Sequence, residues 1–269
     1  MNHPQCVLVT GASSGIGREM ARCLAARGIN LILTARREDR LRELADELTA
    51  QHPIRAHVLP ADLAHPNAGQ RLAHQAIALE PDIDGLINNA GFGLLGPVIS
   101  HPADRLEQMI QLNIAGLTTL TAAFAPRMAT ARRGWICNVA SIAGWQPLAL
   151  MATYAATKAY VLHFSEALWQ ELRPHGVRVS CLCPGPTHSE FFEVAQSAGT
   201  QIRLDRGGVA QTAAVAEAGV RGMLRGTRVV TPGVLNKLAT RLGRLTARSL
   251  LLPAAEKMIR SNCTPSPPS

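Results

Sequence analysis

A phenol and an ammonium group lie four residues apart in the segment Tyr154-Ala-Ala-Thr-Lys158. On a helix, residues with this spacing share one face and lie one turn apart. A free phenol titrates near about 10, and a nearby ammonium favours the ionised form and lowers that pKa. The pair therefore predicts general acid/base chemistry, in which Tyr154 donates a proton to a carbonyl oxygen or removes one from a hydroxyl. The alternative is an exposed helix pair without chemistry.

Two further polar residues could complete this site. Ser141 lies thirteen residues before Tyr154, directly after an apolar run at 135–139 that predicts a strand. Ligands bind at the carboxyl ends of strands in doubly wound folds, so the serine hydroxyl could bond a substrate oxygen and stabilise its developing charge. Asn113 lies between apolar neighbours in a predicted helix and needs hydrogen-bond partners there. It could hold a water that connects Lys158 to solvent, or it could simply be a satisfied buried amide.

A glycine-rich turn, Thr10 to Gly17, separates a predicted strand from a predicted helix. Glycines there supply backbone geometry that other residues cannot, and they permit close packing of helix on strand. The N-terminus of the helix offers free N–H groups and a positive dipole end to a pyrophosphate. The turn therefore predicts a dinucleotide site, although a purely structural turn is the alternative. The turn residues expected at the cofactor are Gly11, Ser13, Ser14, Gly15, Ile16 and Gly17.

The end of the second predicted strand bears on which dinucleotide binds. A carboxylate there would bind a ribose 2′-hydroxyl, but this chain has Thr34-Ala35-Arg36-Arg37. A guanidinium can form a forked pair with a 2′-phosphate, which predicts NADP(H) in preference to NAD(H). The alternative is that both arginines only open a charged surface helix. Asp62-Leu63 follows the third strand, where the carboxylate could accept a bond from the adenine amino group or cap a helix.

The elements that must position these residues alternate along the chain. Apolar strands are predicted at 6–10, 30–34, 57–59, 85–88, 135–139, 177–182 and 228–230. Helices are predicted between them at 18–27, 38–50, 67–79, 103–128, 154–172 and 213–224. This alternation is typical of an α/β fold, a doubly wound parallel sheet covered by helices on both faces. We expect one domain over residues 1–232.

The bulk composition excludes several classes of protein. The chain of 269 residues is 47% hydrophobic and 17% charged, which indicates a globular protein. No apolar run approaches the roughly 18–20 residues needed to span a bilayer, and we recognise no signal peptide. The six cysteines contain no C-x-x-C pair, which favours free thiols in a reducing cytoplasm and no metal site.

The net charge of +8 lies entirely at the C-terminal end. Residues 218–269 hold nine basic residues and one acid, whereas residues 1–217 hold 18 of each sign. Residues 233–262 predict a basic amphipathic helix, which Pro253 should end or bend, and residues 263–269 predict a disordered tail. The basic residues on one side of this helix are Lys237, Arg241, Arg244 and Arg248. The leucines on the other side are Leu235, Leu238, Leu242 and Leu245.

Three partners of this helix stay open. It could pack on its own subunit or an oligomer partner, lie on a membrane surface, or bind an acidic partner, although we expect no nucleic acid. A membrane contact, which would make the protein peripheral rather than simply cytoplasmic, would favour an apolar, lipid-like substrate. Phe191, Phe192 and Val194, in a predicted mobile helical flap at 188–208, would fit such a substrate.

Several motifs taken together resemble the short-chain dehydrogenase/reductase family. They are the glycine turn at 10–17, Asn88-Asn89-Ala90-Gly91, Asn113, Ser141, Tyr154-x-x-x-Lys158 and Pro184-Gly185-Pro186-Thr187. The resemblance covers about residues 5–190 and extends more loosely to 232. It implies a seven-stranded Rossmann fold and hydride transfer between a nicotinamide and a carbonyl or secondary alcohol. It also implies a catalytic tetrad of Asn113, Ser141, Tyr154 and Lys158.

The resemblance also assigns the cofactor contacts. It implies that Lys158 holds the nicotinamide ribose, that Thr187 contacts the carboxamide, and that Ser13 and Arg36 contact the 2′-phosphate. The remaining expected cofactor residues are Asp62, Leu63, Asn89, Ala90, Gly91, Tyr154, Pro184 and Gly185. Relatives that prefer NADP often have a basic residue where this chain has Ser14, so the NADP(H) preference depends on Arg36, with Arg37 beside it.

Family members usually form dimers or tetramers through the helices predicted here at 103–128 and 154–172. A second class of function is a dinucleotide-binding sensor or scaffold that has lost its chemistry. Such a protein has no need for Tyr154, Lys158 and Ser141 together, so their joint presence favours an enzyme. The motifs do not name the carbonyl substrate.

Overall fold

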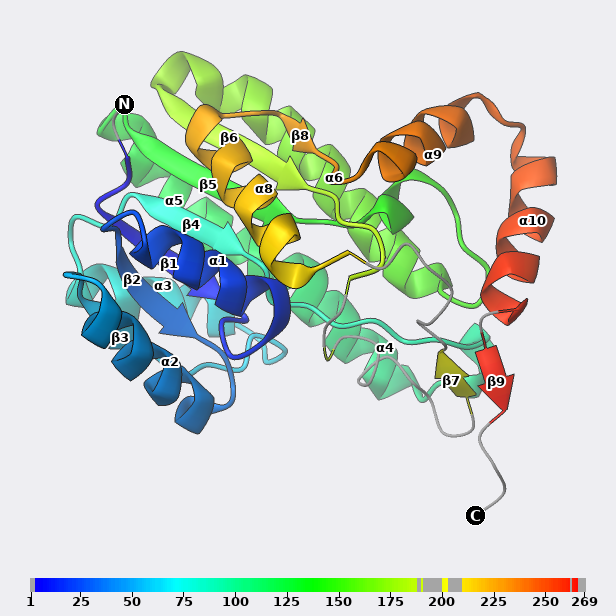
Figure 1. Ribbon diagram of the computed structural model, residues 1–269, viewed down its shortest axis with the longest axis horizontal. Coiled ribbons are helices and arrows are strands. Elements are labelled where there is room, and N and C mark those ends of the chain that lie inside the picture. Colours follow the sequence, from blue (N-terminus) through cyan, green and yellow to red (C-terminus); the bar gives the residue numbers. More distant parts are fainter. Residues whose placement is uncertain (1–2, 188–189, 191–199, 203–209, 262, 266–269) are drawn as a thin grey trace.

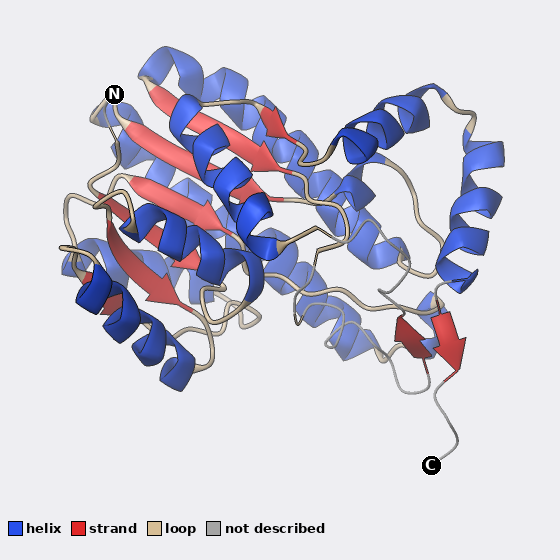
Figure 2. Cartoon of the chain, in the orientation of Figure 1, coloured by secondary structure: helices blue, strands red, loops and turns tan. Residues whose placement is uncertain are grey.

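The computed structural model describes residues 3–187, 190, 200–202, 210–261 and 263–265. Its main sheet is parallel throughout, with the strand order β3-β2-β1-β4-β5-β6-β8 (Figures 1 and 2). This arrangement confirms the predicted seven-stranded Rossmann fold. The strands are β1 (Cys6–Thr10), β2 (Asn30–Thr34), β3 (Ala56–Val58), β4 (Gly85–Asn88), β5 (Gly134–Val139), β6 (Val177–Leu182) and β8 (Val229–Val230).

Helices cover both faces of this sheet, and the strands are apolar on both sides for that reason. In β1, Val7 and Val9 face one core, whereas Cys6 and Leu8 face the other. The first core is closed by α1 (Gly15–Ala25), α2 (Glu38–Gln51) and α8 (Thr212–Arg225), which lie together in Figure 1. The second is closed by α3 (Ala68–Leu79), α5 (Leu117–Thr130) and α6 (Ala152–Leu172).

The chain order reverses between β1 and β4, which are neighbours in the sheet. At such a switch point the connections leave toward opposite faces and open a crevice at the carboxyl ends of the strands. The glycine turn follows β1, and the Asn88–Gly91 segment begins at the last residue of β4. The fold therefore places these two motifs at the same crevice.

The predicted helix at 103–128 is interrupted. It consists of α4 (Ala103–Ile110), a π-helical segment (Gln111–Gly116) and α5. A π-helical segment inserts an extra residue into the turn and often marks a functional position. Asn113 lies inside it.

The C-terminal extension differs from the prediction in three respects. It forms two helices, α9 (Val234–Leu245) and α10 (Arg248–Ser261), and Pro253 lies inside the second. The break falls at Thr246, where the backbone becomes extended. The Ala247 carbonyl then accepts bonds from the N–H groups of Leu250 and Leu251, which starts α10 before Pro253 is reached. A proline removes one intrahelical donor, and here that loss does not end the helix.

The third difference is a small antiparallel pair that joins β7 (Thr200–Ile202) to β9 (Cys263–Pro265). We predicted a helical flap for the first segment and disorder for the second, and both predictions are wrong for these residues because each strand supplies the other's backbone partners. The rest of the predicted flap, including Phe191, Phe192 and Val194, and residues 266–269 lie outside the described residues. Among the described helices, none has the length and apolar character to cross a bilayer.

Candidate active site

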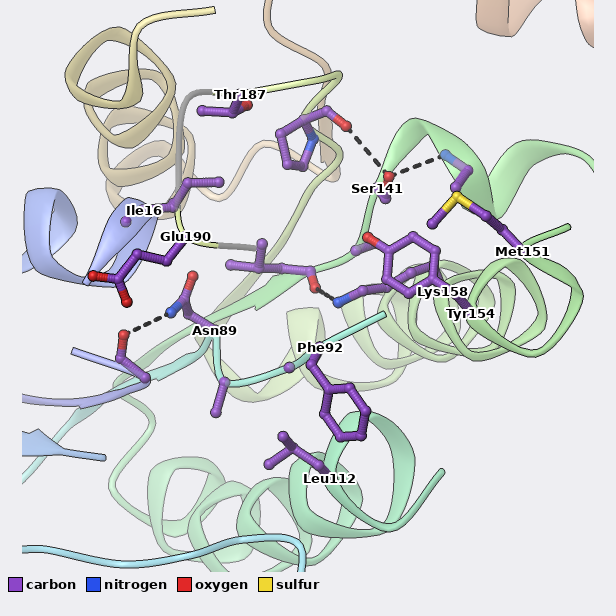
Figure 3. A pocket seen from close by; sticks show the side chains of 18 of the residues that line it. Ile16, Asn89, Phe92, Leu112, Ser141, Met151, Tyr154, Lys158, Thr187 and Glu190 are labelled. Carbon is purple, nitrogen blue, oxygen red and sulfur yellow. Dashed lines mark hydrogen bonds between the residues drawn. The ribbon is translucent and has the colours of Figure 1, made fainter. Parts of the chain in front are cut away.

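A cavity of about 910 Å³ opens at the carboxyl ends of the strands around the switch point. Its wall brings together residues far apart in the sequence: the glycine turn, the end of β2, the segment after β4, Ser141, α6 and the segment after β6 (Figure 3). The predicted residues on it are Gly11, Ser13, Ser14, Gly15, Ile16, Arg36, Arg37, Asp62, Leu63, Asn89, Ala90, Gly91, Ser141, Tyr154, Lys158, Pro184, Gly185 and Thr187. Gly17 and Asn113 lie behind this wall.

Ser141 has a fixed orientation at the start of a 3-10 turn over Ile142–Trp145. The Ala143 N–H donates to its Oγ at 3.1 Å, and its hydroxyl lies 3.5 Å from the Pro184 carbonyl, which can accept its proton. Figure 3 shows both contacts and the Tyr154 ring beside them. Two backbone segments that follow β5 and β6 therefore hold the hydroxyl at the cavity wall.

Tyr154 is almost completely buried in the first turn of α6. Burial raises the pKa of its phenol to about 12, and a hydrogen bond with Ser141 acts in the opposite direction. We had predicted that Lys158 lowers this pKa, and that prediction is wrong for this structure. The phenolate loses its hydration in the protein, and the Lys158 Nζ lies 5.8 Å from the centre of the ring.

Lys158 is also buried, and its ammonium points toward the end of β5 rather than toward the phenol. Its Nζ donates to the Val139 carbonyl at 2.8 Å. Burial lowers the pKa of this lysine to about 8, and the nearby Cys181 and Cys183 partly oppose that shift. The lysine therefore remains mainly protonated at neutral pH but loses its charge only a little above it.

Asn113 connects the segment after β4 to α6. Its Nδ2 donates to the Phe92 carbonyl at 2.9 Å and to the Thr157 hydroxyl at 3.0 Å. Its Oδ1 accepts the Phe92 N–H at 3.1 Å, and a Cβ on Gly91 would come within 2.9 Å of the same oxygen. The amide thus has the partners that its burial requires, and it positions the loop that faces Lys158.

The glycine turn is held against β4 by a second amide. Asn89 Nδ2 donates to the carbonyls of Thr10 and Gly11 at 3.0 and 3.2 Å, and the Thr10 hydroxyl accepts the N–H groups of Asn89 and Ala90. A Cβ on Gly17 would come within 2.4 Å of Asn89 Nδ2 and 2.5 Å of the Gly11 carbonyl. Gly17 therefore permits the close approach, which leaves the start of α1 open toward the cavity.

The two arginines after β2 have different surroundings. Arg36 is exposed and forms no hydrogen bond or ion pair with any residue that the structure describes. Arg37 is half-buried, and its Nη2 donates to the hydroxyls of Ser13 and Ser14 at 3.1 and 3.0 Å. Its Nη1 pairs with Glu190 at 2.7 Å. Of the two guanidiniums, Arg37 is thus the one already bonded to the glycine turn.

Sequence reasoning missed Glu190. It pairs with Arg40 as well as Arg37 and lines the cavity (Figure 3). Burial acts to raise the pKa of its carboxyl, but the hydrogen bonds from the two arginines outweigh burial, and the pKa is lowered. The periodicity after Thr187 is weak and predicts no orientation for single side chains, so the available signal was an acidic residue in a stretch of the chain with few charges.

Asp62 does not cap a helix, because α3 begins at Ala68 after Asn67. Its Oδ1 instead accepts the Ala64 N–H at 2.9 Å and closes a local turn at the cavity wall.

The cavity also has an apolar portion beside Tyr154 and Ser141. Sequence reasoning could not assemble it, since part of its wall comes from α9 and α10, more than 80 residues along the chain from Tyr154. The apolar lining residues on this side are Phe92, Leu95, Leu112, Leu148, Met151, Ala239, Met258 and Ile259. Arg105 and Gln108 of α4 add polar groups, and the Arg105 guanidinium lies over the Phe92 ring at 5.0 Å.

Known reductases resemble this chain. A very-long-chain 3-oxoacyl-CoA reductase of Pyricularia oryzae is 38% identical over 181 residues, which cover 64% of this chain and 53% of that protein. The chain therefore spans about half the length of that relative. A sulfoacetaldehyde reductase of Chromohalobacter salexigens is 38% identical over 218 residues, 77% of this chain and 83% of the relative.

Solved structures extend the similarity over the full fold. A short-chain dehydrogenase from Sphingobium yanoikuyae in complex with NADPH superimposes with a TM-score of 0.80 at 32% identity and covers 98% of both chains. A bulky-bulky ketone specific alcohol dehydrogenase from Comamonas testosteroni has a TM-score of 0.77 at 31% identity and covers 93% of this chain and 94% of its own. The short chain dehydrogenase family model matches residues 5–199. The chain therefore belongs to the short-chain dehydrogenase/reductase family.

Proposed function

We propose that the protein is an NADP(H)-dependent reductase of apolar, bulky carbonyl compounds, with Tyr154 as the general acid. One observation carries the proposal: Tyr154, Ser141 and Lys158 line one cavity whose adjoining wall is apolar. The ketone-specific relative from Comamonas testosteroni supports this substrate class, because its fold matches over nearly the whole chain.

The proton chemistry follows from the surroundings of Tyr154 and Ser141. A phenol whose pKa is raised to about 12 remains protonated at neutral pH, which is the state that a proton donor needs. The Ser141 hydroxyl, fixed by Ala143, can bond the substrate oxygen and stabilise charge that develops on it. Bound NADPH supplies the hydride to the carbonyl carbon. Oxidation of an alcohol would instead need the phenolate as the base.

Lys158 and Asn113 complete the proposed tetrad in different ways. The Lys158 ammonium, anchored on the Val139 carbonyl, holds the nicotinamide ribose and restores the proton of Tyr154. The Asn113 amide instead bonds Phe92 and Thr157. We therefore propose it as a positioning residue for the loop and the helix around the site.

The residues at the adenosine end fit a phosphorylated dinucleotide. Ser13, Ser14, Arg36 and Arg37 supply hydroxyl and guanidinium donors, and no carboxylate stands at the end of β2. Neighbouring structures contain NADPH or NADP, which supports the same choice. We propose that the guanidiniums of Arg37 and Arg36 bind the 2′-phosphate and so give the preference for NADP(H). Asp62 would lie beside the adenine.

The cofactor proposal is tested by binding. Arg37→Ala and Arg36→Ala should each weaken the binding of NADPH and leave the binding of NADH nearly unchanged. Arg37→Ala should have the larger effect, because this guanidinium also bonds Ser13 and Ser14. Dissociation constants from nicotinamide fluorescence measure this difference. Equal losses of affinity for NADPH and NADH would show that these arginines do not recognise the 2′-phosphate.

The chemistry is tested by removing one hydroxyl. Tyr154→Phe should lower kcat for ketone reduction by about 10²-fold or more, since general acid catalysis contributes factors of that order. The other tyrosine of the chain offers a matched control: Tyr160 lies on the same helix, is partly exposed and bonds Thr118 outside the cavity. Tyr160→Phe should keep full activity. If Tyr154→Phe also turned over normally across a carbonyl panel, the mechanism would be wrong.

We also propose assembly into a dimer or tetramer through α4, α5 and α6. Ile110 and Tyr160 are exposed on these helices, and the Tyr160 ring stacks on Phe164 at 5.7 Å. Sedimentation velocity of the wild type and Tyr160→Glu tests the contact; a wild-type monomer would exclude it.

A further inference from the structure

Helix α9 packs on the protein through its small and polar side. A Cβ on Gly185 would come within 2.5 Å of the Asn236 amide, and a Cβ on Gly243 would come within 2.8 Å of the Gln146 side chain. Thr240 is buried on the same side. The backbones therefore approach closely along this face, which carries small and polar residues.

The apolar side of α9 points into solvent. Val234 and Leu235 are 81% and 77% exposed, and Leu238 and Leu242 are 52% and 54% exposed. A soluble helix normally has the reverse orientation, with leucines inward and polar residues outward. Leu250 of α10 is also largely exposed. Leu235, Leu238 and Leu242 are thus left largely uncovered by their own subunit, although α9 itself packs on that subunit through its other side.

Basic side chains border this apolar strip. At about 100° per residue, Arg241 and Lys237 lie about 20° and 60° beyond Val234, along one edge of the apolar strip on α9, and Arg248 begins α10. All three are exposed and form no ion pair with the described part of the chain. The apolar strip thus lies within the segment, residues 218–269, that carries the whole excess charge of the protein.

A second copy of the chain or a membrane surface could cover this apolar strip, and the charge beside the strip distinguishes the two. A second copy on this strip would bring another Lys237 and Arg241 to the same interface, and like charges oppose that contact. An anionic lipid surface offers an apolar layer for the leucines and negative headgroups for the flanking basic residues at the same time. Charge complementarity therefore favours the bilayer.

We propose that α9 and the start of α10 form a binding surface for anionic membranes, on which the protein lies without spanning the bilayer. The same two helices also contribute Ala239, Thr240, Met258 and Ile259 to the cavity wall. Membrane binding would thus hold the apolar part of the cavity one helix diameter from the lipid, which suits a substrate that dissolves in lipid. Binding requires no turnover, so this proposal and the proposed reaction can fail separately.

The test is flotation of the full-length protein with vesicles of phosphatidylcholine alone or with about a third phosphatidylserine. We expect wild type to float with the anionic vesicles and to remain largely free with the zwitterionic ones. Lys237→Gln/Arg241→Gln should lower the partition coefficient by about tenfold or more. Leu235→Ser/Leu238→Ser should abolish flotation. The matched control, Arg221→Gln/Arg225→Gln on α8, removes the same charge from exposed positions outside the strip and should float like wild type.

Circular dichroism and NADPH binding establish that each variant is folded. Three results would overturn the proposal, of which the first two come from flotation. One is that wild type fails to float with anionic vesicles, and another is that the α9 and α8 charge variants float equally. The third is that Leu235→Ser/Leu238→Ser dissociates an oligomer in sedimentation velocity, which would show that a second copy covers the leucines.

Discussion

Replacing Lys158 with methionine should make the protein more stable at neutral pH. Burial lowers the pKa of this lysine from 10.5 to about 8, so the folded state holds its charge less favourably than the unfolded chain does. A shift of that size corresponds to about 3 kcal/mol at pH 7. Methionine leaves the Val139 carbonyl without its donor, at a cost of about 1 kcal/mol. The expected net gain for Lys158→Met is therefore about 2 kcal/mol.

The free energy of unfolding should change with pH in the direction expected for a lysine whose pKa is lowered in the folded state. Between about pH 8 and 10.5 the unfolded chain binds more protons than the folded protein, so the stability contribution of Lys158 rises with pH. The advantage of Lys158→Met should shrink over this window, by about 2 kcal/mol between pH 7 and 9.5. Buried cysteines, whose pKa values are raised, act in the opposite sense above pH 9, but they are common to both proteins and largely cancel in the difference.

Urea unfolding of both proteins at several pH values measures this difference. A Lys158→Met advantage that stayed constant from pH 7 to 9.5 would refute the reasoning, because it would mean that the folded lysine titrates like an unfolded one. The activity of Lys158→Met should fall at every pH, so this one substitution separates stability from catalysis. A variant that gained stability and kept its turnover would contradict the proposed role of the lysine.

Four other predictions follow from single contacts. For the free enzyme, kcat/KM for ketone reduction should decline above about pH 8 as Lys158 loses its proton, and a profile flat to pH 10 would contradict this. Glu190→Gln should tighten the binding of NADPH several-fold but not that of NADH, because it frees Arg37 from a competing carboxylate. A fluorescence titration that shows no change in the NADPH dissociation constant would mean that the 2′-phosphate binds elsewhere. Asn138→Ala should lower the free energy of unfolding by about 2–3 kcal/mol, since buried Asn88 and Ser165 both lose their bonds to it, and an unchanged urea midpoint would rule this out. Gly144→Ala should reduce both stability and kcat, because its Cβ would come within 2.5 Å of the Lys158 carbonyl and would push the Ser141 turn away from α6; unchanged kinetics would show that the turn adapts.

The sheet and its motifs were predictable because each depends on a short stretch of sequence. β1 shows this well: Cys6 to Thr10 are all buried, as a strand between two helical layers must be, and the glycine turn follows at once. Ser141 and Lys158 were placed correctly at the cavity for the same reason, since a strand end and a helical turn fix their positions without distant contacts.

The C-terminal helices were less predictable because tertiary contacts decide their orientation. The helical wheel of α9 identifies its leucine side correctly but cannot say which side packs, and here the contact with Gly185 and Gln146 selects the small, polar side. The pairing of β7 with β9 joins segments more than 60 residues apart, so neither segment contains a signal for it. Glu190 was missed for a similar reason, since its partners Arg37 and Arg40 lie about 150 residues earlier.

The pKa of Tyr154 shows where a local argument gave the wrong sign. Spacing alone puts Lys158 one turn away, and an ammonium at that distance should favour the phenolate. The folded chain instead directs that ammonium to the Val139 carbonyl and removes water from the phenol, so desolvation outweighs attraction. Both groups are driven toward their neutral forms, yet at neutral pH this leaves a protonated phenol beside a lysine that still carries its proton. That is the protonation state that the proposed general acid catalysis by Tyr154 requires, and the spacing alone predicted the phenolate instead.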